Sequence, residues 1–417
     1  MGRLLASTVV LLAAVTLLAG AADAAPGLKV GVTDDAWLEF GPGTLEQRVA
    51  QLQTMGVQVV RVTLDWYEVE AEQGTYDWAR DGMLLDALRT AGITPVVAIW
   101  GTPAWANGGA RPNVPPSSAA SFASFARAAA ERFPWVRRWI VWNEPNQRRW
   151  LLPPSPALYV TKLLNPGGAA IKDVIPQASV AGGATAPRGA SGGVSPVDFI
   201  RGMGRAGAHL DAYAHHPHPL SPAETPLGGG CAACTTISMA TLDRLVDATR
   251  AAFGPRIRLW LTELGFQTNP PDRTLGVTWA KQARFVAEAQ MRAYRTSGVD
   301  ILVQYLVRDE PMLDAWQSGL ETVTGAAKPA IASFSLPLAQ VKRTGRATTL
   351  WGQVRPGDGP RAYVLQRRSS GRWVAVGTAG QTNTRGYFTR TIAADIGAQV
   401  RLVDPATRRA SPTLIVT

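Results

Sequence analysis

The chain alternates between short apolar runs and longer segments in which apolar residues recur at helical spacing. Runs such as Val57–Leu64 and Ile93–Trp100 are rich in Val and Ile and are typical of buried strands. The segments between such runs place apolar residues three and four positions apart, which predicts amphipathic helices. This alternation extends from about Leu28 to Pro337. It predicts parallel strands joined by helical crossovers.

Eight strand–helix units can be placed in this region. The predicted strands are 28–33, 57–64, 93–100, 138–142, 179–184, 210–215, 257–262 and 300–307. The predicted helices are 44–55, 80–91, 117–133, 157–174, 197–204, 238–253, 278–296 and 328–334, with a potential break at 166–168. Eight such units predict a (β/α)8 TIM barrel. The rival architecture, an open doubly wound sheet, would place a Gly-rich phosphate loop after an early strand, and the sequence has none there.

After Pro337 the pattern changes to short strand-like runs separated by turn residues. The predicted strands are 348–355, 361–368, 373–377, 387–392, 399–403 and 413–416. This spacing predicts a small C-terminal β-sandwich. We therefore expect a barrel domain over 25–338 and a β-sandwich domain over 339–417, with 339–346 as the linker.

The N-terminus has the three parts of an export signal. Arg3 supplies the positive end, residues 4–20 are almost wholly apolar, and Ala22-Asp23-Ala24 is a cleavage site of small residues. We expect a signal peptide over 1–24 and a secreted or cell-surface protein. An uncleaved anchor is the alternative, since the apolar run approaches the shortest spanning length.

The chain has two cysteines, Cys231 and Cys234. In an exported protein two cysteines this close predict a local disulfide that constrains one loop. Redox chemistry or half of a zinc site is the alternative, but no second cysteine pair exists to complete a four-sulfur site.

The net charge of +11 is concentrated at one end. Residues 341–417 carry 13 Lys and Arg against 3 Asp and Glu, whereas the rest carries 29 against 28. Basic surfaces attract polyanions, and export disfavours nucleic acid as the partner. We expect either an anionic cell-envelope polymer or acidic polysaccharide as partner, or simply a soluble basic domain.

Two glutamates stand where the barrel would place its chemistry. Glu144 and Glu263 each follow a predicted strand, the fourth and the seventh. In a TIM barrel the carboxyl ends of the strands form the active site, and these two strands lie on opposite sides of its mouth. A single such glutamate is more often a solvated loop residue, but paired carboxylates across a cleft are the machinery of glycosidic bond cleavage.

Two motifs around these glutamates resemble a known clan. Asn143-Glu144-Pro145 and Thr262-Glu263-Leu264-Gly265 are similar to the strand-four and strand-seven motifs of the retaining (β/α)8 glycoside hydrolases, which include cellulase-like and β-xylosidase-like enzymes. The resemblance spans about residues 28–337. Further similar phrases are Trp100-Gly101-Thr102-Pro103, Ser318-Gly319-Leu320 and Lys328-Pro329-Ala330.

The resemblance implies a role for each matching residue. Glu144 would be the acid/base and Glu263 the nucleophile, with Arg61 supporting the nucleophile and no cofactor required. Asn143 would bind the sugar 2-hydroxyl. The acid must be protonated to donate, and we expect apolar neighbours to raise its pKa.

Histidines and aromatic residues complete the expected site. His216 and His218 alternate onto one face at the end of strand six, and His218 stands where the clan usually has a tyrosine that contacts the nucleophile. Together with His215 they could also suggest a metal, but no acidic or cysteine partner is near in sequence, and we expect none. Trp100, Trp105 and Tyr305 are candidate sugar contacts.

Three other acids end strands and are possible rivals of the main pair. Asp65 follows strand two, and Asp309 and Glu310 follow strand eight. None has the sequence context of the main pair, and we interpret all three as substrate or network residues.

These patterns favour a secreted retaining glycoside hydrolase that cleaves β-glycosidic bonds in a polysaccharide or glycan. Two alternatives stay open: a barrel that binds glycans without cutting them, and an envelope-attachment protein that acts through its basic C-terminal domain.

Overall fold

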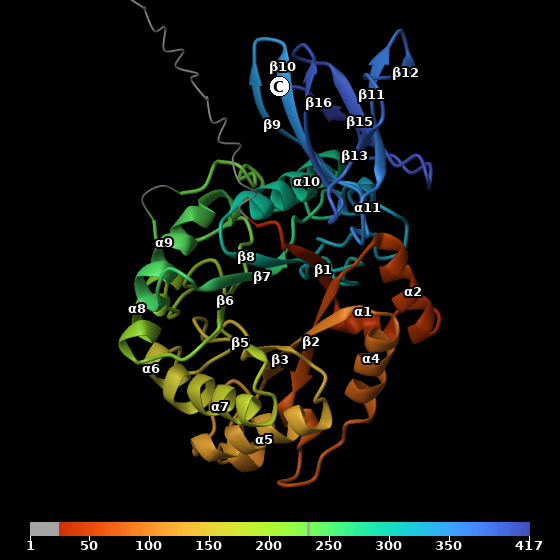
Figure 1. Cartoon of the computed structure of the whole chain (residues 1–417). Helices are drawn as coiled ribbons and strands as arrows, with labels where there is room; N and C mark the ends of the chain where they lie inside the picture. The colour runs from red at the N-terminus through yellow and green to blue at the C-terminus, as the bar shows by residue number, and fades with distance from the viewer. Residues whose placement is uncertain (1–24, 232–233) are drawn as a thin grey trace, which may run out of the picture.

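A computed structural model describes residues 25–231 and 234–417, so the predicted signal peptide lies outside the described residues (Figure 1). Eight parallel strands close into a barrel in chain order, which confirms the predicted fold. The strands are β1 (Lys29–Thr33), β2 (Val59–Asp65), β3 (Thr94–Trp100), β4 (Arg138–Val141), β5 (Ser179–Thr185), β6 (Ala212–His215), β7 (Arg258–Leu264) and β8 (Val299–Tyr305).

The inside of the barrel is filled by small and branched side chains and one large ring. Trp260 fills the space that the small residues leave, and all members of this cluster are buried. The cluster consists of Val59, Val96, Ala98, Ile140, Ala181, Ala184, Ala212, Ala214, Trp260, Ile301 and Val303. The inside of the barrel is therefore a packed core and not a channel.

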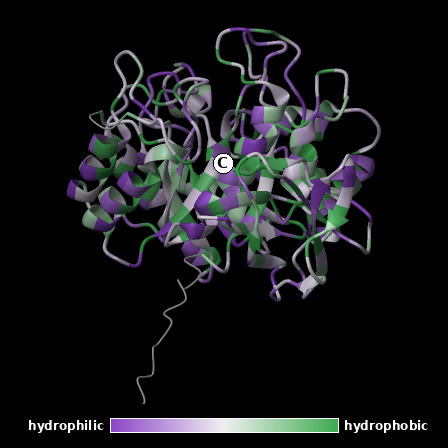
Figure 2. Ribbon diagram, turned by 90° about the horizontal axis from the view of Figure 1, so that it is seen from above, coloured by the Kyte–Doolittle hydropathy of each residue, from purple (hydrophilic) through white to green (hydrophobic). Residues whose placement is uncertain are grey.

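Amphipathic helices surround the strands, and Figure 2 shows that they carry both hydrophilic and hydrophobic residues. Thr44 caps the helix that follows it and forms a capping box with Gln47, as its sequence predicts. The α-helices are α1 (Asp35–Phe40), α2 (Leu45–Met55), α3 (Trp66–Val69), α4 (Ala79–Thr90), α5 (Ala119–Arg132), α6 (Pro156–Tyr159), α7 (Asn165–Val174), α8 (Pro196–Arg205), α9 (Leu242–Phe253), α10 (Trp279–Arg295) and α11 (Pro329–Ser335).

The potential break at 166–168 is wrong. The chain is helical from α6 through a π-helical segment, η2 (Val160–Leu164), into α7. Pro166 lies in the first turn of α7, where the wider π turn before it accommodates the missing N–H.

The C-terminal residues form two antiparallel sheets, which confirms the predicted β-sandwich. One sheet has the order β14-β10-β9, and the other contains β12-β11-β15-β16 with β13 paired to β11. Their bounds are β9 (Leu338–Thr344), β10 (Ala347–Gln353), β11 (Ala362–Ser369), β12 (Arg372–Ala375), β13 (Gly380–Gln381), β14 (Tyr387–Ala393), β15 (Gln399–Val403) and β16 (Leu414–Ile415). The predicted linker 339–346 is therefore wrong, since most of it is strand β9.

The β-sandwich packs directly on the barrel beside α10 and α11 (Figure 1). Arg355 is fully buried at this contact, where it donates to Gln290 of α10 and lies over the ring of Phe334 with 4.6 Å to the centroid. Tyr387 donates to the carbonyl of Leu28 over 3.2 Å, just before β1. Within the described residues, no helix is long and apolar enough to cross a membrane.

Candidate active site

Both glutamates lie at the carboxyl ends of barrel strands. Glu263 is the sixth residue of β7, and Glu144 follows β4 in a tight turn. Trp142 and Glu144 have positive φ angles of 73° and 37°, which are unfavourable for residues with a side chain. The Glu144 N–H donates to the Ala184 carbonyl over 3.0 Å and holds this turn against β5. Such backbone strain is typical of functional sites.

The two carboxylates face each other across a short gap. An oxygen of Glu144, an oxygen of Glu263 and a ring nitrogen of His216 all lie within 4.8 Å of one another. Carboxyl groups of retaining glycosidases are separated by about 5–5.5 Å, and those of inverting enzymes by about 6.5–9.5 Å. The observed spacing fits direct attack by one carboxylate better than it fits the wider gap of inverting enzymes.

Arg61 connects the two motifs from inside the barrel. Its Nη1 donates to Glu263 Oε1 over 2.8 Å, and its Nη2 donates to Asn143 Oδ1 over 2.8 Å. The side chain is almost fully buried. One guanidinium therefore binds both the carboxylate of Glu263 and the residue next to Glu144.

His216 and His218 both contact the carboxylates. His216 Nδ1 lies 3.0 Å from Glu144 Oε1 and 3.6 Å from Glu263 Oε2. His218 Nδ1 accepts a hydrogen bond from the Gly265 N–H over 3.2 Å, so its proton is on Nε2, which lies 3.5 Å from Glu263 Oε2. The backbone of β7 thus sets the tautomer of His218 so that an N–H points at Glu263.

The surroundings of Glu263 keep it ionised. Burial by itself would raise the pKa of Glu263, but the nearby His216, Arg61 and His218 outweigh burial and hold the pKa well below its usual range. A buried carboxylate that its neighbours keep negatively charged is suited to act as a nucleophile.

His215 does not belong to this group. Its Nδ1 contacts Thr185 Oγ1 at 2.9 Å and its Nε2 contacts the Ile237 carbonyl at 2.9 Å. Burial lowers the pKa of His215 from its ordinary 6.5 to about 3. It is a neutral structural residue that joins the end of β5 to the loop after β6.

This neutral histidine predicts a pH dependence of stability. Below pH 6.5 His215 binds a proton in the unfolded chain, whereas in the folded chain it binds one only near pH 3. The free energy of unfolding therefore falls as the pH falls from 6.5 to about 3. We expect His215→Gln to flatten the curve by up to about 1.4 kcal/mol per pH unit. Urea unfolding of both proteins between about pH 7 and about pH 5 measures this difference, and parallel curves would contradict it.

The three histidines do not converge on a metal position. Among the described residues, the group with metal-ligand spacing is Glu144, His216 and Glu263. This group contains both facing carboxylates, so it coincides with the candidate catalytic pair.

A cavity of about 280 Å³ opens beside Glu144. Its lining includes Glu144, Gln147, Arg188, His218, Gln267 and Trp316. The sequence analysis missed Trp316, whose ring lies 4.5 Å from that of His218 and 5.2 Å from that of Tyr305. Trp316 lies eleven residues after the end of β8. It stands just before Ser318-Gly319-Leu320, one of the motifs of the resemblance, and this proximity could have marked it as a site residue.

The three aromatic residues predicted to contact sugar pack against other protein groups. Tyr305 packs against His218 with 5.6 Å between centroids. Trp100 packs against Trp150 at 5.0 Å, and Trp105 donates from its indole N–H to the Glu70 carbonyl over 2.9 Å. Neither tryptophan lines the cavity beside Glu144. Their contact with sugar stays a prediction.

The rival acids have other partners. Asp309 pairs with Lys328 at 2.7 Å in the interior, and Glu310 Oε2 accepts from the Trp316 N–H over 2.6 Å. Asp65 is the last residue of β2, where burial raises its pKa to about 7 and Arg80 is 3.8 Å away.

Cys231 and Cys234 are joined in the loop that follows β6, as predicted. Arg244 of α9 donates to the Cys231 carbonyl over 3.2 Å and ties this loop to the helix.

No protein-family model matches the sequence, and no curated protein matches it. Solved structures do resemble it. A family 39 glycoside hydrolase from the gut symbiont Bacteroides cellulosilyticus WH2 has a TM-score of 0.59 at 16% identity, covering 88% of this chain and 79% of that one. The GH39 enzyme from Xanthomonas axonopodis pv. citri has a TM-score of 0.60 at 15% identity, covering 91% and 94%.

A glucosidase from Croceicoccus marinus has a TM-score of 0.59 at 12% identity, covering 91% of this chain and 95% of that one. At these identities the likeness establishes the fold. The chain has the (β/α)8 barrel with additional β-structure that is shared with glycoside hydrolases, in agreement with the resemblance of its motifs.

Proposed function

We propose that this protein is a retaining glycoside hydrolase that cleaves β-glycosidic bonds, with Glu144 as acid/base and Glu263 as nucleophile. The observation that carries the proposal is the facing pair of carboxylates, whose oxygens lie within 4.8 Å of each other at the mouth of the barrel. The likeness to solved glycoside hydrolases supports the same activity.

In the first step Glu263 attacks the anomeric carbon while Glu144 protonates the departing glycosidic oxygen. The bond to the leaving group breaks, and an ester bond between the sugar and Glu263 forms. Arg61 and His218 orient the attacking carboxylate. Asn143 accepts from Arg61 through Oδ1, which leaves its Nδ2 to donate to the sugar 2-hydroxyl.

In the second step Glu144 acts as a base. It removes a proton from water, the resulting hydroxide attacks the anomeric carbon, and Glu263 is released as a carboxylate. His216 lies between the two carboxylates throughout and holds Glu144 in place. Two inversions at one carbon give net retention, and no cofactor enters either step.

Turnover of a panel of aryl β-glycosides and of polysaccharides tests this proposal. We expect hydrolysis of at least one glycoside class by the intact chain and none by Glu263→Ala. If the intact chain binds sugars but hydrolyses none of the panel, the protein is the non-cutting glycan-binding barrel.

The signal-like N-terminus and the basic β-sandwich support secretion and contact with an anionic polymer of the cell envelope or an acidic polysaccharide. The exposed basic side chains of the domain include Lys342, Arg346, Arg368, Arg372, Arg385 and Arg408. Two of them, Arg368 and Arg372, lie on one hairpin of β11 and β12. Because the domain is docked on the barrel through Arg355, it is best tested in the whole chain.

We expect the chain to bind an anionic polysaccharide at low salt, and Arg368→Glu with Arg372→Glu to weaken this binding several-fold. Arg205→Glu on α8 is the matched control, since it removes the same kind of charge from the outside of the barrel. If the unmodified chain, the Arg368/Arg372 variant and the Arg205 variant bind the polysaccharide equally well, the β-sandwich is not the docking surface.

A further inference from the structure

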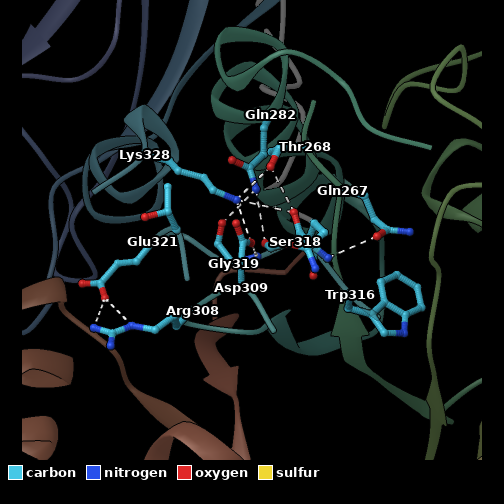
Figure 3. Close-up of polar contacts among 12 residues, drawn as sticks. Gln267, Thr268, Gln282, Arg308, Asp309, Trp316, Ser318, Gly319, Glu321 and Lys328 are labelled. Atoms are coloured by element: carbon cyan, nitrogen blue, oxygen red, sulfur yellow. Dashed lines mark hydrogen bonds and ion pairs between the residues drawn. The ribbon is translucent and has the colours of Figure 1, made fainter. Parts of the chain in front are cut away.

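The loop between β8 and α11, residues 306–328, is fixed by a buried ion pair. Lys328 Nζ lies 2.7 Å from Asp309 Oδ1, and the two side chains are 0% and 2% exposed. The same ammonium donates to Thr268 Oγ1 over 2.9 Å and to the Gln317 carbonyl over 3.4 Å. Figure 3 shows Lys328 at the centre of these contacts. All three N–H groups of the lysine therefore have acceptors.

Both charges of this pair are buried away from water. Burial lowers the pKa of Lys328 and raises that of Asp309, so the interior disfavours both charges. Apolar side chains in the place of a buried ion pair are often neutral or stabilising, which makes the pair a weak explanation of stability. A role in fixing one loop conformation is a better explanation.

The contacts of the pair lead to Trp316. Gln317, whose carbonyl accepts from Lys328, is 1% exposed and donates from Nε2 to the Glu310 and Met312 carbonyls, over 3.2 and 2.8 Å. Its own N–H donates to Gln267 Oε1 over 3.1 Å (Figure 3). These bonds close the loop on both sides of Trp316.

The loop is also built without spare room. A Cβ on Gly319 would lie 2.4 Å from the Asp309 nitrogen, and a Cβ on Gly265 would lie 2.6 Å from Ser318 Oγ. Gly319 thus allows the loop after β8 to fold closely on itself, and Gly265 allows the chain after β7 to touch that loop at Ser318.

From Trp316 the contacts continue to the nucleophile. The Trp316 ring lies 4.5 Å from the His218 ring, and His218 Nε2 lies 3.5 Å from Glu263 Oε2. The chain of contacts therefore runs from Lys328 through Gln317, Trp316 and His218 to Glu263.

We propose that Lys328 and Asp309 are positioning residues of the active site, which act by holding Trp316 against His218 and thereby orient the donor to Glu263. This inference rests on the proposed function, because its main readout is glycoside turnover. It assigns a role to the Lys328-Pro329-Ala330 motif that the catalytic pair leaves unexplained.

A double-mutant cycle on activity tests it. The double variant Asp309→Asn with Lys328→Met removes both charges, so neither is left buried without its partner. We expect this variant to fold and to lose about 10-fold or more in kcat/KM. In a Trp316→Ala background the same double change should cost less than about 3-fold, because its route to Glu263 is already broken. Equal losses in both backgrounds would overturn the proposal.

The matched control is Glu321→Gln. Glu321 pairs with Arg308 at 2.9 Å in the same loop, but its other partner is Gln51 of α2 and not the Trp316 segment. We expect its kcat/KM to stay within about 2-fold of the unmodified chain, and a loss equal to that of the Asp309/Lys328 variant would also overturn the proposal.

A second readout does not depend on activity. In protein labelled with fluorotryptophan, the ¹⁹F resonance that disappears in Trp316→Phe should shift in the Asp309/Lys328 variant and stay in place in Glu321→Gln. An unmoved resonance would reject the positioning role. A shifted resonance in a chain that hydrolyses no glycoside would instead retain the positioning role and reject the proposed function.

Discussion

Glu263→Ala is expected to reduce kcat for every hydrolysed glycoside by about 10³-fold or more, because it removes the atom that forms the covalent intermediate. No other carboxylate could take over this role without the contacts that position Glu263. Glu263 is held by Arg61 at 2.8 Å and approached by His218 at 3.5 Å, and its side chain is only 12% exposed. Initial rates of the purified variant on the best substrate measure the loss.

Two controls separate chemistry from folding. The far-UV circular dichroism spectrum of Glu263→Ala should show that the variant is folded, and its affinity for the sugar should persist. A small anion such as azide should enter the space left by the carboxylate and partly restore turnover. Activity that survives at more than about one tenth of the original rate would remove Glu263 from the mechanism.

Glu144→Ala is expected to show a loss that depends on the leaving group. A poor leaving group needs the proton that Glu144 supplies, so natural glycosides should lose about 10²–10⁴-fold in kcat/KM. An activated aryl glycoside whose phenolate departs unaided should lose far less in the first step. Rates across a series of aryl glycosides with leaving groups of different pKa measure this dependence.

The alanine change at Glu144 also removes the partner of His216, which lies 3.0 Å from Oε1. Glu144→Gln is therefore the control, since it keeps the shape and a contact to His216 but cannot donate the same proton. Equal losses for good and poor leaving groups in both variants would contradict the acid/base role.

The barrel was predictable because its signal is repeated. Strands such as Ile93–Trp100 are apolar on both faces, and the helices between them keep one apolar side, so local pattern and global fold agree. The segment 339–346 was misjudged as a linker because Gln340, Lys342 and Arg343 make it polar. It pairs with β10 at the edge of a sheet, where one side of the strand faces water.

The two glutamates and the residues bonded to them could be predicted from sequence motifs, whereas Trp316, which lines the cavity beside them, could not. Glu144, Asn143 and Glu263 stand in short motifs at strand ends, and Arg61 in β2 bonds to the last two of them. Trp316 lies in a loop of 23 residues, 306–328, without periodicity. Its position is set by the buried contacts of Lys328 and Gln317, which are not encoded in any local spacing.

The most direct measurement of the central claim is the anomeric configuration of the first sugar released. Proton NMR during the opening minutes of hydrolysis, before the product equilibrates in water, separates the two anomers. With carboxylate oxygens within 4.8 Å of each other, the β anomer should appear first from a β-glycoside. First appearance of the α anomer would mean that water attacks directly, and Glu263 would not be the nucleophile.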